Sequence, residues 1–174
     1  EEVEPPSGYA YSKKIPFTVP QSPKTIEIVM EDKPTNLLVE KLTEAMVASP
    51  SEAEHQLSGF KLQILNADKS PAIAARTTED FKAGEELIFT TGNQFKQLIG
   101  QLIAGQSYWL HEISPRDGYA YAEDVMFTVS LDGREDIVLM VDKPTQVIVS
   151  KKAITGDNEL PGNYMSIRNM AGAV

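Results

Sequence analysis

Short runs in which branched and aromatic residues alternate with polar ones recur along the middle of the chain. These runs are Leu37–Leu42, Phe60–Leu65, Glu85–Thr90, Ser107–Ile113, Val125–Leu131 and Asp136–Val141. Turn-forming residues separate them, including Ala83-Gly84, Thr91-Gly92-Asn93, Ala104-Gly105 and Asp132-Gly133. Short strands at regular spacing with such turns are typical of an antiparallel sandwich or barrel, so we predict an all-β fold. A short helix is expected within residues 44–55, where Ser51 and Glu54 have the spacing of a capping box.

Alternation along a strand also predicts which charged side chains point inward, because every second residue faces the same side. Three charged residues share the parity of apolar neighbours, which means that they lie an even number of positions from them along the strand and face the same side. They are Lys41 with Leu37 and Val39, Glu112 with Tyr108 and Leu110, and Asp142 with Val138 and Met140. The same parity is found for Asp32 with Ile26, Ile28 and Met30, and for Lys151 with Val147 and Val149. We therefore expect Lys41, Glu112 and Asp142 to face one interior, and Asp32 to point inward with its apolar neighbours.

The charged positions belong to a repeat. Residues Glu2–Lys41 and Glu112–Lys151 are identical at 16 of 40 positions without a gap, whereas composition alone gives about two or three identities. The shared text includes Glu-x-x-Pro-x-x-Gly-Tyr-Ala-Tyr, Phe-Thr-Val, Met-x-Asp-Lys-Pro-Thr and Val-x-Lys. An offset of 110 residues is one domain length, which indicates an array of domains rather than a solenoid of small units.

A further similarity places the domain boundaries. Leu57-x-Gly59 and Leu160-x-Gly162 are each followed by Ile, at Ile64 and Ile167, with an offset of 103 residues. The segment of residues 43–56 is therefore longer in the earlier copy. We predict the C-terminal part of a preceding repeat at residues 1–35, one complete repeat at 36–145, and the N-terminal part of a following repeat at 146–174.

Composition excludes several functions. The net charge of −9 is a poor match to nucleic acid or anionic lipid, and no apolar run approaches the roughly 18 residues of a membrane helix. His55 and His111 are the only histidines and no Cys is present, so no metal or other cofactor is expected. No Ser/His/Asp set or phosphate-binding loop indicates a turnover enzyme.

Two interpretations fit Lys41, Glu112 and Asp142. A structural ion pair, or exposure at strand ends, is common for such residues. In the alternative, burial lowers the pKa of the lysine and raises that of the acid, so that a neutral amine faces a protonated carboxyl group. The amine then attacks the carboxyl carbon while a second carboxyl group transfers protons, and an amide forms between the first and last strands.

The same residues carry a resemblance to the SpaA-like, or Cna protein B-type, domains of Gram-positive surface proteins and pilins. Tyr108-x-Leu110-x-Glu112-x-x-Pro115-x-x-Gly118-Tyr119 is similar to the signature of that family. Ile99-Gly100-x-Leu102-x-x-Gly105, Phe127-Thr-Val129, Asp142-x-Pro144-Thr and Val149-x-Lys151 with Glu159-Leu160-Pro161-Gly162 fit it as well. The resemblance covers essentially the whole chain. It implies a prealbumin-like antiparallel β-sandwich in tandem repeats, one complete and two partial.

The resemblance also implies an intramolecular isopeptide bond. Carried over by position, the bond joins Lys41 to Asp142, with Glu112 as the catalytic acid and proton relay. Lys151 is then the reactive lysine of the following repeat, and Glu2 and Asp32 are the acid and acceptor of the preceding one. This chain has Asp where many members have Asn at the acceptor, and Asp is chemically competent for the reaction.

These expectations define a structural or adhesive stalk module of a protein on the cell surface or cell wall of a Gram-positive bacterium. Its partners would be neighbouring repeats of the same chain and host or matrix proteins or glycans, with neither nucleic acid nor membrane insertion. The alternative is a carbohydrate- or protein-binding sandwich without a covalent bond, and an accessory domain of an enzyme is a third interpretation.

Overall fold

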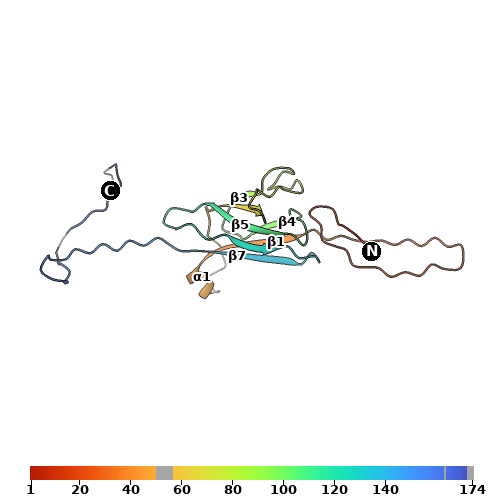
Figure 1. Ribbon diagram of the computed structural model, residues 1–174, viewed down its shortest axis with the longest axis horizontal. Coiled ribbons are helices and arrows are strands. Elements are labelled where there is room, and N and C mark those ends of the chain that lie inside the picture. Colours follow the sequence, from red (N-terminus) through yellow and green to blue (C-terminus); the bar gives the residue numbers. More distant parts are fainter. Residues whose placement is uncertain (50–56, 163, 172–174) are drawn as a thin grey trace.

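The computed structural model describes residues 1–49, 57–162 and 164–171. A β-sandwich occupies the middle of the molecule (Figure 1). The N-terminal segment, which precedes β1, extends from one end of the sandwich as a long, narrow loop, and the C-terminal segment that follows β7 leaves from the opposite end (Figure 1). The chain therefore enters the sandwich at one end and leaves it at the opposite end.

Two sheets form from the described residues, as the alternating runs predict. One has the strand order β4-β1-β7, with β4 at Lys96–Ile99, β1 at Asn36–Thr43 and β7 at Glu135–Asp142. The other has the order β3-β2-β5-β6, formed by Ile88–Thr90, Lys61–Asn66, Ser107–Ser114 and Val125–Thr128. The predicted all-β sandwich is confirmed.

Most neighbouring strands are antiparallel, but β1 and β7 run parallel, in register from Asn36 opposite Glu135 to Thr43 opposite Asp142. A parallel pair needs a crossover connection, and here the crossover is the remainder of the sandwich. The first and last strands of the unit therefore lie side by side.

The core lies between the two sheets and consists of the inward-facing residues of each strand. From the three-stranded sheet these include Leu37, Val39, Val138 and Met140, and from the other sheet Leu62, Ile64, Tyr108 and Leu110. All are buried, so the predicted parity of β1, β5 and β7 is confirmed. Burying each large aliphatic side chain contributes about 1.5–3 kcal/mol.

One strand was missing from the prediction, whereas the short helix expected within residues 44–55 is present. β4 was not among the predicted strands: it is a four-residue edge strand held by pairing with β1. The helix α1 spans Glu44–Ala48 and is capped by the hydroxyl of Thr43, which accepts a hydrogen bond from the N–H of Met46. The proposed capping box at residues 51–54 lies outside the described residues.

Candidate functional site

Lys41, Glu112 and Asp142 meet in the space between the two sheets. Lys41 on β1 and Asp142 at the end of β7 belong to neighbouring strands of one sheet, whereas Glu112 lies on β5 of the facing sheet. Nζ of Lys41 is 2.6 Å from Oδ1 of Asp142 and 2.9 Å from Oε1 of Glu112, and all three side chains are 0% exposed. The structure thus brings together three charged groups from distant parts of the chain.

Strand register explains how Lys41 reaches Asp142. In the parallel pair, Lys41 lies opposite Met140, and Asp142 is two residues further along β7. Residues two apart on a strand face the same side. The Asp142 side chain therefore stands on the interior face next to the lysine, and the long lysine side chain spans the offset.

The aromatic ring of Phe60 covers the lysine ammonium group. Nζ lies 5.1 Å from the ring centroid, within the range of a cation–π contact. Phe60 is fully buried and packs edge-on against Tyr119, with ring centroids 5.2 Å apart. This packing places apolar surface around the charged cluster, so the cluster lies in a medium of low polarity.

The cluster holds two acids and one base, which would leave one uncompensated negative charge if all three were ionised. Burying such a charge costs several kcal/mol. Burial raises the pKa of Asp142 and repulsion from Glu112 adds to this, while the hydrogen bond and positive charge of Lys41 act in the opposite direction. The net effect is a raised pKa, which favours the protonated form of Asp142.

The four carboxyl oxygens have different surroundings. Oε2 of Glu112 accepts a hydrogen bond of 2.8 Å from the backbone N–H of Ala122, which fixes the orientation of this carboxyl group. Its Oε1 forms an ion pair with Lys41 Nζ, although the direction of approach is not that of a hydrogen bond. Oδ1 of Asp142 accepts a hydrogen bond from Lys41, but Oδ2 is buried without a hydrogen-bond partner among the described residues.

This arrangement suits condensation between Lys41 and Asp142. The amine nitrogen contacts the carboxyl group that it would attack, and that acid is displaced toward its neutral, more electrophilic form. Glu112 is held by a backbone N–H within reach of the same nitrogen, where it can accept a proton. A buried structural ion pair would use the same contacts but leaves Oδ2 unsatisfied.

Glu2, Asp32 and Lys151 occupy the equivalent positions of the repeated sequence, and no ion pair or hydrogen bond joins them to one another among the described residues. Oε2 of Glu2 accepts a hydrogen bond of 2.7 Å from the N–H of Ser12, the counterpart of the bond between Glu112 and Ala122. Asp32 is exposed, so the prediction that it points inward is wrong. Its segment forms no strand ladder with the described residues, and alternation alone does not bury a side chain. Lys151 is also exposed, and its N–H donates to Glu159.

Two contributors to the site were not singled out in the sequence. Phe60 lies in a predicted strand, but no local pattern indicates its contact with Lys41, and the N–H of Ala122 carries no side-chain signal at all. The repeat offers one clue to the second, because Ser12 and Ala122 occupy the same position after the repeated Tyr-Ala-Tyr. A backbone donor can be conserved in position while its side chain changes.

The remaining candidates lie apart from this cluster. Nδ1 of His111 is 2.7 Å from Oδ1 of Asp124, and both side chains are partly exposed, away from the buried face of β5. No group of metal-binding side chains occurs in the part of the chain that the structure describes. Within the same residues, no helix is long and apolar enough to cross a membrane.

No protein-family model and no curated protein matches the chain. Among solved structures it is similar to the shaft pilin SpaA from Lactobacillus rhamnosus GG, with 17% identity, a TM-score of 0.43, and coverage of 84% of this chain and 64% of that one. It is also similar to GBS52, the minor pilin of Streptococcus agalactiae, with 18% identity, a TM-score of 0.46, and coverage of 67% and 48%. The 35 kDa C-terminal fragment of the major pilin GBS80 of that species has 14% identity, a TM-score of 0.41, and coverage of 64% of this chain and 45% of the fragment. The chain thus spans less than two thirds of each of these proteins, and the fold assignment rests on the strand pairing described above.

Proposed function

We propose that this chain is a structural module of a cell-surface protein, in which Lys41 and Asp142 form an isopeptide bond with the help of Glu112. The observation that supports this is the fully buried Lys41–Glu112–Asp142 cluster, with the amine 2.6 Å from one carboxyl group and 2.9 Å from the other. The resemblance of the surrounding residues to SpaA-like domains of Gram-positive surface proteins agrees with this role. A location on the cell surface or in the cell wall belongs to the same proposal.

The proposed organisation is a tandem array. Residues 36–145 form the complete repeat, preceded by the C-terminal part of one repeat at 1–35 and followed by the N-terminal part of another at 146–174. In support, the cluster draws all three of its residues from 36–145, and the two ends of that unit lie at opposite ends of the sandwich (Figure 1). Modules joined end to end make a stalk, so the direct binding partners of each module are the neighbouring repeats of the same chain.

The reaction begins with the neutral amine of Lys41 and the protonated carboxyl group of Asp142. Nζ attacks Cγ, and a tetrahedral intermediate forms. Glu112 accepts a proton from the nitrogen and transfers it to the departing hydroxyl group of Asp142, so the C–O bond breaks and water leaves. One N–C bond has formed, one water has been released, and Glu112 has returned to its starting state. The reaction occurs once per molecule, so the module is not a turnover enzyme.

Burial favours the product. The amide carries no charge, so condensation replaces a buried amine and a buried carboxyl group, both of which can ionise, with one neutral group, and an oxygen leaves as water. In the uncondensed cluster Asp142 Oδ2 has no hydrogen-bond partner among the described residues, which costs about 1–3 kcal/mol. Loss of one carboxyl oxygen relieves that cost.

The proposal is tested by the intact mass of the purified chain. A cross-linked chain has the mass of its sequence minus one water, and digestion should yield one branched peptide that contains both Lys41 and Asp142. Lys41→Met and Glu112→Gln should each restore the full sequence mass. The matched control is Lys151→Ala, which alters the exposed lysine of the next repeat and should leave the mass deficit unchanged.

A wild-type mass equal to the sequence mass would exclude the bond. The alternative function, a binding sandwich without a cross-link, would then be examined with a glycan array or with matrix proteins. If Lys151→Ala abolishes the deficit while Lys41→Met does not, the assignment of the reactive lysine is wrong.

A further inference from the structure

The repeated Pro-x-x-Gly-Tyr-Ala-Tyr turn is partly buried at its first occurrence. Gly8, Ala10 and Thr35 are all covered by the sandwich of residues 36–145, with Ala10 only 1% exposed. Contact with Gly100 is very close, because a Cβ atom built on Gly8 would lie 2.3 Å from the Gly100 carbonyl oxygen. Only a residue without a side chain fits there.

Hydrogen bonds join the same turn, together with Thr35, whose N–H donates to Gly8, to two loops at this end of the sandwich. The N–H of Gly100 donates to the carbonyl oxygen of Thr35 at 2.7 Å, and the Thr35 hydroxyl donates to the carbonyl oxygen of Leu102 at 2.9 Å. The N–H of Tyr11 donates to the carbonyl oxygen of Leu131 at 2.9 Å. The contact is therefore a specific joint between the preceding segment and the complete unit.

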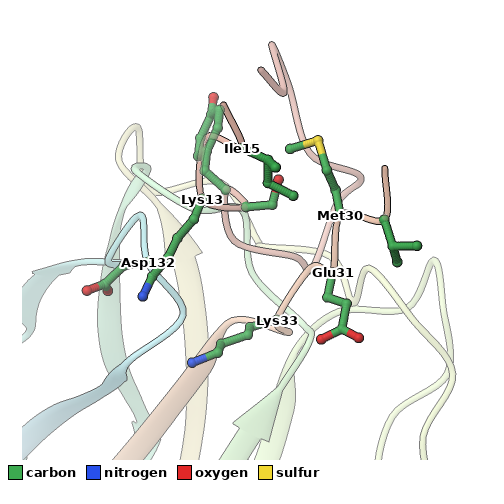
Figure 2. A pocket seen from close by; sticks show the side chains of 9 residues that line it. Lys13, Ile15, Met30, Glu31, Lys33 and Asp132 are labelled. Atoms are coloured by element: carbon green, nitrogen blue, oxygen red, sulfur yellow. The ribbon is translucent and has the colours of Figure 1, made fainter. Parts of the chain in front are cut away.

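Side chains extend the joint on both sides. The guanidinium group of Arg76 lies 4.8 Å from the ring centroid of Tyr9. On the other side, Tyr11, Lys13, Lys33 and Asp132 line a hollow between the N-terminal segment and the turn that precedes β7 (Figure 2). The preceding segment thus contacts the sandwich over a surface wider than the turn itself.

The second occurrence of the turn has the same internal hydrogen bonds. The N–H of Ala10 donates to Lys33 and that of Ala120 to Lys143, at 2.8 and 3.0 Å. The N–H of Thr35 donates to Gly8 and that of Thr145 to Gly118, at 2.9 and 2.8 Å. The backbone φ angles of Gly8 and Gly118 are also nearly equal, 86° and 89°. The two turns are therefore built alike.

Their outer surfaces differ. Gly118, Ala120 and Thr145 are exposed, whereas their counterparts in the first turn are buried. Nothing lies within 4 Å of a Cβ atom built on Gly118. Tyr121 is 67% exposed against 39% for Tyr11, and its N–H has no acceptor among the described residues. The second turn therefore leaves uncovered the surface that is covered in the first.

We propose that the turn of residues 118–121, together with Thr145, docks onto the following repeat. The occupant consists of the loops of that repeat that correspond to residues 99–105 and 131–133, which hold the first turn in this structure. Each repeat then ends in a turn that locks into the loops of the next, and the array is a stiff rod. This inference rests on the proposed tandem organisation but not on the isopeptide bond.

The test compares the 174-residue chain with a tandem variant in which residues 1–145 are followed directly by a second copy of residues 36–145. Thr145 corresponds to Thr35, so the second copy begins in the natural register. Amide hydrogen exchange at Tyr121 is the readout, because its counterpart Tyr11 is hydrogen-bonded across the joint. Exchange at Tyr121 should slow about tenfold or more in the tandem variant.

Two glycine variants separate docking from backbone strain. Gly118→Ala in the tandem variant places a methyl group in the close approach seen at Gly8, so the slow exchange at Tyr121 should be lost. Gly84→Ala is the control: its φ is 86° and nothing lies within 4 Å of its Cβ position, so the strain is the same without a contact. Gly84→Ala should keep the slow exchange.

The 174-residue chain provides a second measurement that needs no tandem variant. Gly8→Ala should speed exchange at Tyr11 about tenfold or more, while Gly118→Ala leaves Tyr11 unchanged. Equal exchange at Tyr121 in the two chains, or no effect of Gly118→Ala in the tandem, would overturn the inference. Protection of Tyr121 that depends on the concentration of the 174-residue chain would also overturn it, since the occupant would then be a second copy. Slow exchange together with an unmodified mass would refute the bond and leave the joint intact.

Discussion

Glu112→Gln is the perturbation that best isolates the cross-link. Glutamine has nearly the same shape, its carbonyl oxygen can still accept the hydrogen bond from the N–H of Ala122, and the Lys41–Asp142 ion pair remains. What disappears is the group that moves protons. We therefore expect a folded, well-packed protein that lacks the bond and has the full sequence mass.

The magnitude follows from the length of chain that the bond closes. Lys41 and Asp142 are 101 positions apart, and closing a loop of about 100 residues removes unfolded-state entropy equivalent to about 4.7 kcal/mol at 25 °C. For a domain of about 100 residues, each kcal/mol changes Tm by about 4 °C. Glu112→Gln should therefore lower Tm by about 20 °C, measured by calorimetry on samples whose mass has been checked.

Introducing Glu112→Gln into Lys41→Met as well as into the wild-type protein distinguishes the effect of losing the bond from the effect of losing the glutamate charge. In Lys41→Met no bond can form, and Glu112→Gln there removes repulsion with Asp142, so it should leave Tm unchanged or raise it slightly. An equal drop in both backgrounds would show that the loss comes from packing or charge. A Glu112→Gln protein without the bond whose Tm falls by only a few degrees would refute the entropic argument itself.

Two further predictions concern the environment of the cluster. In Lys41→Met, burial and Glu112 both keep the pKa of Asp142 raised. The folded state then binds more protons than the unfolded state above the unfolded pKa of about 3.9, so the free energy of unfolding should fall as pH rises through the folded pKa. Urea denaturation from pH 4 to 8 measures this, and Lys41→Met/Asp142→Asn should lack that slope. Phe60→Ala should cost about 3–5 kcal/mol and lower the cross-linked fraction seen by mass spectrometry, because water reaches Nζ; Phe60→Leu should retain most of it.

Local patterns predicted the strands well where a strand has one buried face. The alternation in β1, β5 and β7 identified which side chains face the core, including the three charged ones. β4 was missed because Lys96–Ile99 is too short to alternate and exists through its pairing with β1. Asp32 was misplaced for the converse reason, since its segment alternates but has no strand ladder to bury it.

The site depends on topology that local patterns do not encode. Strand parity predicts that Lys41, Glu112 and Asp142 each point toward a core. The parallel pairing of β1 and β7 is what puts Lys41 beside Asp142, and the packing of one sheet against the other is what adds Glu112. The repeat supplied what parity lacked, because it separated Lys151 from Asp142 despite their closeness in sequence. The donor of the hydrogen bond from Ala122 to Glu112 is a backbone N–H, so no side chain in the sequence indicates it.

The position of the proposed bond also determines how the module responds to force. Tension along the chain enters at the start of β1 and leaves after the end of β7, which are parallel neighbours. With the bond formed, the load passes from Asn36 to Lys41, through the amide, and out at Asp142, so residues 42–141 carry none of it. The wild-type unit should therefore not lengthen when it is pulled in a single-molecule experiment. Glu112→Gln should release the 101-position segment between the two residues, a gain of about 340 Å at about 3.4 Å per residue. The same gain in the wild-type protein would show that no covalent path connects the strands.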